Sequence, residues 1–164
     1  MSSEPMATGQ VTIKASPDEV YRMISDPTVM VGFSEELFKV RWLRGATGPE
    51  VGARFSGSNR NGRHRWVTTC RITDAEPGRR FAYEVRTPFG VPVARWQYDL
   101  VADGDGCTVT ETNWARVPGW FIPIAILITG EPDRPGVNKR NIATTLGRLK
   151  DHLESQRAET ARAA

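Results

Sequence analysis

Cysteine and histidine are scarce in this sequence, which has two of each in 164 residues. Cys70 and Cys107 stand far apart and do not form the spaced groups that disulfide frameworks and zinc sites require. His64 and His152 are also isolated, so a histidine-based metal site is not expected. We therefore predict two buried cysteines in a reducing cytoplasm, with no metal and no cofactor.

Long hydrophobic runs are absent as well. The most apolar stretch, 117–128, contains two prolines and is shorter than the roughly 20 residues that span a bilayer. Residues 1–7 lack the basic start and apolar centre of a signal peptide, and we predict a flexible tail there. These absences predict a soluble, cytoplasmic protein with no stable membrane insertion.

Several motifs that identify enzymes or nucleic-acid-binding proteins are missing. The sequence has no glycine-rich phosphate loop, no G-x-S-x-G nucleophile motif and no H-E-x-x-H metal motif. The net charge is only +3, and the densest run of arginines, 54–71, alternates out of phase with the aromatic residues of the same segment. Base stacking needs exposed aromatic rings beside basic residues, so no nucleic-acid partner is expected.

The sequence does contain one long helical pattern near its end. We predict a helix over 137–154, because large aliphatic residues recur there with the spacing of one helix face, at Ile142, Leu146, Leu149 and Leu153. Pro135 and Gly136 are expected to break the chain before this helix. The apolar face must pack against other elements, because packing supplies most of the stability of an amphipathic helix. The charged, alanine-rich segment 156–164 is predicted to fray.

Most of the chain before this helix alternates between apolar and polar residues, which predicts strands. A first strand at about 8–14 precedes a short helix capped by Ser16, and a second short helix is predicted over 27–33. Six more strands are predicted, at about 38–42, 53–59, 63–74, 81–85, 94–100 and 107–115. This order predicts an α+β architecture, an antiparallel sheet packed on the final helix, in one domain over 8–155.

Particular segments then resemble a known superfamily. They are Ala-Ser-Pro-Asp-Glu-Val-Tyr at 15–21, Gly-Ala-Arg-Phe at 52–55, Asn-Arg-Asn-Gly at 59–62, Glu-Pro-Gly-Arg-Arg-Phe at 76–81, and the hairpin 96–109. The chain resembles START-like, or SRPBCC, proteins over about 8–155, and these include the polyketide cyclase/dehydrase group. The resemblance implies a helix-grip fold: a curved antiparallel sheet of about seven strands, with two short helices after the first, wrapped around the C-terminal helix. It also implies a cavity for a hydrophobic ligand between them.

Candidate ligand-binding residues are aromatic or polar side chains expected on the inner face of the sheet, or residues of the final helix and of the apolar connector. The candidates are Trp42, Phe55, Asn59, Trp66, Phe81, Tyr83, Trp96, Glu111, Asn113, Trp120, Phe121 and Leu146. The alternative for the aromatic residues is ordinary core packing, since each ring buries a large apolar area. Trp114 does not fit the inward register of its strand.

Glu111 is the main candidate for proton transfer. It shares its strand face with Val109, and a carboxylate inside a pocket has a raised pKa because burial disfavours its charge. His64 and Tyr83 are the other catalytic candidates. Alternatively, Glu111 pairs with an arginine or is turned outward by a bulge, and His64 is structural or solvated.

Three functions remain open at this stage. The first is binding of a small hydrophobic molecule, such as a lipid, a polyketide or an aromatic metabolite, by a monomer or homodimer. The second is a polyketide aromatase/cyclase or dehydrase that uses Glu111 with His64 or Tyr83. The third is a regulatory or stress-linked domain that acts through a protein partner.

The apolar connector 117–128 has three corresponding interpretations. It packs over one end of the sheet and helix, it forms a lid with Gly119 and Gly130 as flexible ends, or it is an exposed patch for a membrane or a partner.

Overall fold

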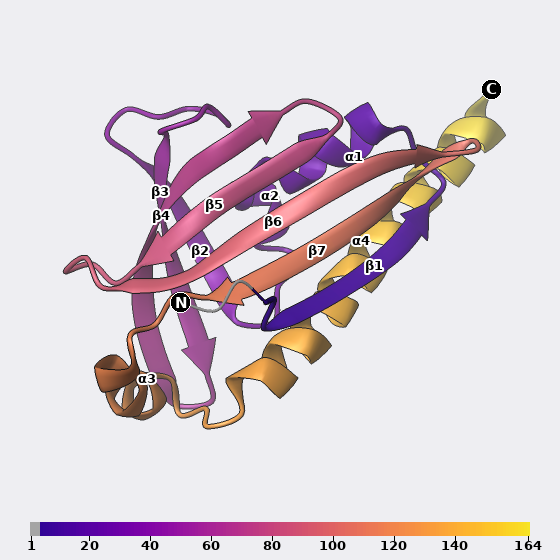
Figure 1. The fold of residues 1–164 in the computed structure, drawn as a ribbon. Coiled ribbons are helices and arrows are strands. Elements are labelled where there is room, and N and C mark those ends of the chain that lie inside the picture. Colours follow the sequence, from indigo (N-terminus) through magenta and orange to yellow (C-terminus); the bar gives the residue numbers. More distant parts are fainter. Residues whose placement is uncertain (1–3) are drawn as a thin grey trace.

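The computed structural model describes residues 4–164 as a curved seven-stranded sheet with one long helix along it (Figure 1). The strands lie in the order β1-β7-β6-β5-β4-β3-β2, and each pairs antiparallel with its neighbour. The elements are β1 (Ala7–Ile13), α1 (Pro17–Ile24), α2 (Pro27–Met30), β2 (Leu37–Leu43), β3 (Arg54–Asn61), β4 (His64–Glu76), β5 (Arg80–Arg86), β6 (Pro92–Asp103), β7 (Gly106–Ala115), η1 (Gly119–Phe121), α3 (Ile122–Thr129) and α4 (Arg134–Ala163). The predicted α+β helix-grip fold is confirmed.

The first short helix begins at its predicted capping residue, Ser16, and the second begins after Asp26, for which no capping role was predicted. The Ser16 hydroxyl accepts a hydrogen bond from the Glu19 amide at 3.2 Å, and the Glu19 carboxylate accepts one from the Ser16 amide at 2.8 Å. This reciprocal pair is a capping box. Asp26 caps α2 through its side chain. Because α2 ends at Met30, it is shorter than the segment 27–33 predicted from sequence.

Side chains alternate between the two faces of the sheet as predicted. On β4, Cys70 and Ile72 are buried, whereas Arg71 between them is exposed. Asn61 pairs with His64 across the β3–β4 turn. Gly62 in this turn has φ = +57°, a conformation that favours glycine. The inward face of the sheet therefore carries the large apolar side chains toward α4.

The closest crossing between α4 and the sheet lies at β1, which Figure 1 shows running beside the helix. A Cβ atom at Gly9 would lie 2.7 Å from the Ile142 Cγ2 atom, so the helix can approach this strand only because Gly9 has no side chain. The predicted apolar face of α4 is confirmed, because Ile142, Leu146, Leu149 and Leu153 are all buried.

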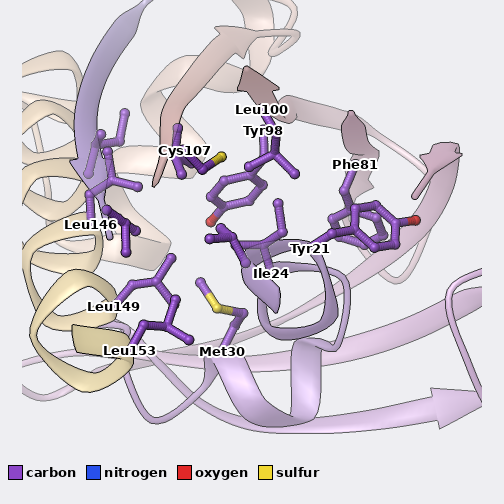
Figure 2. Close-up of a cluster of buried hydrophobic side chains, with 14 of the residues drawn as sticks. Tyr21, Ile24, Met30, Phe81, Tyr98, Leu100, Cys107, Leu146, Leu149 and Leu153 are labelled. Atoms are coloured by element: carbon purple, nitrogen blue, oxygen red, sulfur yellow. The ribbon is translucent and has the colours of Figure 1, made fainter. Parts of the chain in front are cut away.

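The core near α1 and α2 is filled by side chains from three layers (Figure 2). Leu149 and Leu153 of α4 point toward Met30, and Tyr98 of β6 approaches from the sheet beside Ile24 of α1. All five residues are buried. This packing fixes the two short helices between the sheet and α4.

Both ends of the C-terminal region differ from the sequence-based expectation. Pro135 and Gly136 lie within the first turn of α4 instead of breaking the chain, since the first turn of a helix does not need the missing proline amide. Asp133 caps this turn by accepting a hydrogen bond from the Gly136 amide at 3.1 Å. At the other end, residues 156–163 continue the helix rather than fraying, as their alanine, glutamate and arginine content favours.

The predicted connector also contains a helix, α3, which the two prolines of the segment concealed. Pro123 occupies the first turn of α3, where a proline is tolerated. Of the predicted tail 1–7, residues 1–3 lie outside the described part of the chain, and Ala7 already belongs to β1. No helix within residues 4–164 is both long enough and apolar enough to cross a membrane.

Candidate functional site

A cavity of about 460 Å³ lies between the inner face of the sheet and residues 134–145 of α4. Its walls come from β3 to β7, from α3, from α4 and from the segment 30–37 that precedes and begins β2. Most of the lining side chains are apolar or aromatic. A volume of this size is within the range of small-molecule sites, roughly 300–1,000 Å³.

Seven of the residues predicted to bind a ligand line this cavity, all of them on the inner faces of β3 to β7. They are Phe55, Asn59, Trp66, Tyr83, Trp96, Glu111 and Asn113. The rings of Phe55 and Tyr83 meet edge to face, with centroids 5.3 Å apart, which is a favourable aromatic arrangement. The alternation of residues along each strand is what brings this set together.

Three other predicted residues are inward but do not line the cavity. Trp42 lies at the β2 edge and contacts the Phe55 ring edge-on at 5.8 Å. Phe81 is almost fully buried in the core. Leu146 lies beyond the cavity on α4 and faces Gly9 of β1. Strand and helix periods identify the face on which a residue lies, but not its position along the element.

The connector residues and His64 also lie outside the cavity lining. Trp120 is 67% exposed, and Phe121 is buried against Phe89, with ring centroids 6.2 Å apart. His64 is exposed at the start of β4 and lies directly against Gly130, which follows α3. The predicted proton-transfer pairing of His64 with Glu111 therefore has no support from their positions.

Glu111 is a buried carboxyl group in the cavity wall. The Tyr98 hydroxyl donates a hydrogen bond to Glu111 Oε1 at 2.8 Å, and no described residue is a partner of Oε2. Burial raises the pKa of Glu111 to about 8, against the lowering effect of the Tyr98 hydrogen bond. The group is thus mainly protonated at neutral pH, and it pairs with Tyr98 rather than with an arginine. In the sheet it stands opposite Gly9.

The two tyrosines near Glu111 remain neutral for the same reason. Burial, and then the nearby Glu111 charge, raise the pKa of Tyr98 well above its usual value. Burial also raises the pKa of Tyr83, with smaller effects from Cys70 and Glu111. The deep wall of the cavity therefore offers hydroxyl and carboxyl groups that donate or accept hydrogen bonds without carrying charge.

A second buried polar contact connects the sheet to α4. Asn138 of α4 donates from Nδ2 to Asn113 Oδ1 of β7 at 2.8 Å, and Asn113 Nδ2 donates to the Arg95 carbonyl at 3.3 Å. Both asparagines line the cavity and both are buried. A satisfied amide pair of this kind fixes the position of the helix against the strand.

The end of the cavity near the start of α4 carries an ion pair. Arg134 Nη1 donates to both carboxylate oxygens of Glu36, at 2.9 and 2.8 Å. The Arg134 guanidinium carbon also lies 5.9 Å from the centroid of the Trp66 ring, within cation–π range. This pair connects α4 to the segment before β2.

Sequence reasoning missed Tyr98, Asn138, Arg134 and Glu36 as cavity residues. Tyr98 could have been found, because it shares a strand face with the predicted Trp96. Asn138 could also have been found, because it lies four residues before Ile142 on the same helix face. Arg134 precedes the predicted helix, and no local pattern distinguishes it from a solvated position. Glu36 lies in a turn, where the alternation rule for strands does not predict the direction of a side chain.

The described residues contain neither a cluster of metal ligands nor a reactive cysteine. Within residues 4–164, no group of three or more His, Cys, Asp or Glu side chains is placed to hold a metal ion. Cys70 and Cys107 are unpaired and buried, as predicted. Burial raises the pKa of the Cys70 thiol to about 12, which suppresses the reactive thiolate.

Comparison with known families assigns the chain. The family described as polyketide cyclase/dehydrase and lipid transport matches residues 5–154, nearly the whole sequence. The chain belongs to this family. The START-like resemblance noted in the sequence is thereby confirmed. No curated protein sequence matches this member of the polyketide cyclase/dehydrase and lipid transport family significantly.

Solved structures share the fold of this family member. A polyketide-cyclase-like protein from Corynebacterium glutamicum is 25% identical, with a TM-score of 0.56 over 94% of this chain and 95% of that one. The di-domain ARO/CYC StfQ of the steffimycin biosynthetic pathway is 12% identical, with a TM-score of 0.70 over 92% and 51%. DynU16, from the dynemicin biosynthetic locus, is 18% identical, with a TM-score of 0.62 over 92% and 47%. The chain therefore spans about half the length of StfQ and DynU16.

Proposed function

We propose that this protein binds a small hydrophobic molecule, such as a lipid, a polyketide or an aromatic metabolite, in the cavity between the sheet and α4. The observation that carries the proposal is the unfilled volume of about 460 Å³ with a mostly apolar lining. Apolar walls contribute binding free energy in proportion to the ligand area that they remove from water. Membership of the polyketide cyclase/dehydrase and lipid transport family supports this role.

The polar groups in the cavity wall should orient a bound ligand as well as strengthen its binding. Glu111 Oε2 has no hydrogen-bond partner among the described residues, and a protonated carboxyl can donate to an oxygen of the ligand. A ligand with one carbonyl or hydroxyl group on an otherwise apolar skeleton fits this arrangement. A buried polar group that gains a partner on binding adds specificity.

Filling the cavity should weaken ligand binding. Ala94 lines the cavity from β6, and we expect Ala94→Trp to weaken binding of an apolar naphthalene-sulfonate fluorescent probe about tenfold or more, because the new ring occupies the ligand volume. Fluorescence titration measures the dissociation constant. Native mass spectrometry of protein purified from its own host should likewise show a bound small molecule that the variant lacks.

Val101→Trp is the matched control for this experiment. Val101 lies on the same strand, is 64% exposed and points to the opposite face of the sheet, so the same ring is added outside the cavity. The proposal is overturned if both variants, with thermal transitions like that of the wild type, bind the probe as the wild type does.

A second function, cyclisation or dehydration of a polyketide chain, is favoured by the buried Glu111–Tyr98 pair. A neutral carboxyl at 2.8 Å from a neutral phenol can donate or accept a proton at a bound chain, while the cavity supplies positioning. Tyr83 remains in this proposal, and His64 is left out because of its position. We expect Glu111→Gln to lower turnover of a poly-β-keto substrate by about 100-fold or more, with little change in probe binding. Unchanged turnover would exclude a proton-transfer role for this carboxyl group.

A further inference from the structure

The surface at the end of the cavity carries an exposed group of large apolar side chains, here called the α3 patch. It consists of Phe89, Trp120, Ile122, Ile124 and Leu127. Leu127 is 78% exposed, Phe89 70% and Trp120 67%. Phe89, from the β5–β6 loop, is connected to η1 through its contact with Phe121, so the patch is continuous across two parts of the chain. Exposed apolar groups of this kind mark interaction surfaces.

The helix at the centre of the patch is apolar on every side. The sequence of α3, Ile-Pro-Ile-Ala-Ile-Leu-Ile-Thr, has no charged residue, and none of its residues, all of which are described, is buried. An ordinary surface helix has one apolar face and one polar face. One side of α3 lines the cavity through Ala125 and Thr129, so an outside partner meets only the opposite side, which carries Ile124 and Leu127. That side presents hydrocarbon and no charged side chain, which favours a lipid environment.

The position of α3 is fixed firmly enough to present the patch. Asn61, at the β3–β4 turn, donates a hydrogen bond from Nδ2 to the Thr129 carbonyl at 2.9 Å, and His64 lies against Gly130. Figure 1 shows α3 beside the β3–β4 hairpin at one end of the molecule, separate from α1 and α2 at the other. The patch is thus a protruding end rather than part of the core.

The charges around the patch complement an anionic surface. Arg63 is exposed in the turn of the hairpin beside α3, and Arg86 is exposed at the end of β5, where it donates a hydrogen bond to the Gly90 carbonyl next to Phe89. Arg65 does not belong to this group, because its guanidinium lies over the Phe38 ring of β2. Glu131 and Asp133 lie just beyond α3, where Asp133 caps α4. Arginines near a membrane attract acidic headgroups, each by a modest amount that salt screens.

The α3 patch also adjoins the cavity. Ile122, Ala125 and Ile126 of α3 line the cavity, as do Thr129 and Glu131 after them. A bilayer contacted by the outer side of α3 would lie next to the opening through which an apolar molecule enters or leaves. We propose that α3 and its neighbouring aromatic residues dock this protein on the surface of a lipid bilayer that contains anionic lipids.

Vesicle co-sedimentation tests this docking surface with the full chain. We expect the wild type to bind phosphatidylcholine–phosphatidylglycerol vesicles, and to bind vesicles of phosphatidylcholine alone more weakly. The double variant Trp120→Ser, Leu127→Ser should have a vesicle partition coefficient about tenfold or more below that of the wild type, because two large apolar side chains no longer enter the interface. Sodium chloride should reduce the difference between the two vesicle types.

The double variant Val67→Ser, Val101→Ser is the matched control, since it removes two exposed apolar side chains from β4 and β6 rather than from the α3 patch. It should bind vesicles as the wild type does. The proposal is overturned if the wild type does not sediment with either vesicle, or if both double variants bind equally. It is also overturned if size-exclusion chromatography shows a wild-type dimer that only the Trp120→Ser, Leu127→Ser variant loses, which would assign the patch to a second copy of the chain.

This docking does not depend on the identity of the cavity ligand. Ala94→Trp, which blocks the cavity, should leave vesicle binding unchanged, so a failed ligand-binding proposal and a failed docking proposal give different results.

Discussion

The Glu111→Gln variant is expected to be more stable than the wild type at pH 8, by about 1–3 kcal/mol in the free energy of unfolding, because the amide cannot ionise but leaves its buried N–H groups without a partner among the described residues. Glutamine has nearly the shape of the protonated carboxyl group, and its oxygen can still accept the Tyr98 hydrogen bond. The wild-type carboxyl, in contrast, must either keep its proton or place a charge in a buried site. Stabilisation by this substitution would identify Glu111 as a residue retained for a purpose other than folding.

The pH dependence has a definite sign. Burial raises the pKa of Glu111 from 4.5 to about 8, so between these values the folded state holds a proton that the unfolded state releases. The free energy of unfolding of the wild type should therefore fall as pH rises through this window, by about 1.4 kcal/mol per pH unit from this group. Below pH 4.5 both states are protonated, and the contribution of Glu111 no longer changes.

Urea denaturation at a series of pH values from about 5 to 9 measures this effect across the window in which the two states differ in protonation. Subtracting the Glu111→Gln curve from the wild-type curve isolates the carboxyl group. Glu50→Gln, at an exposed loop position, is the control and should run parallel to the wild type. Parallel curves for Glu111→Gln as well would show that the Glu111 carboxyl has no raised pKa in the folded protein.

The second large effect concerns the closest crossing of helix and sheet. We expect Gly9→Val to lower the free energy of unfolding by about 1–3 kcal/mol, because the added side chain must displace Ile142 from a packed site. A Cβ atom alone would already lie 2.7 Å from Ile142 Cγ2. Thermal denaturation should show a midpoint lowered by several degrees.

Gln10→Val is the control for this substitution. Gln10 neighbours Gly9 on β1 but is exposed on the other face, so it receives the same side chain without meeting α4. If both variants unfold at the wild-type temperature, the close approach of Gly9 to Ile142 is not a constraint on the fold.

Much of the fold could be predicted from local patterns. The Ser16 cap and the apolar stripe of α4 each depend on neighbouring residues only, and each forms as expected. The inward direction of Trp66 and Glu111 followed from strand alternation in the same way. Local chemistry decides these features, so the sequence suffices for them.

The site was less predictable because its edges depend on contacts between distant elements. Leu146 and Phe81 have the correct inward direction but lie where the core closes, and only the three-dimensional packing distinguishes them from cavity residues. Arg134 and Glu36 are 98 positions apart, and neither has a local signal. The helix α3 was missed because its prolines suggested a loop.

The register of β1 on β7 places Gly9 directly opposite Glu111, so the close approach of α4 to Gly9 adjoins the carboxyl group whose pKa is raised by burial. A substitution that moves α4 away from Gly9 is therefore expected to let water reach the carboxyl group and to lower the pKa of Glu111 toward its usual value. The absence of a side chain at Gly9 of β1 is thus expected to contribute to the raised pKa of Glu111 on β7.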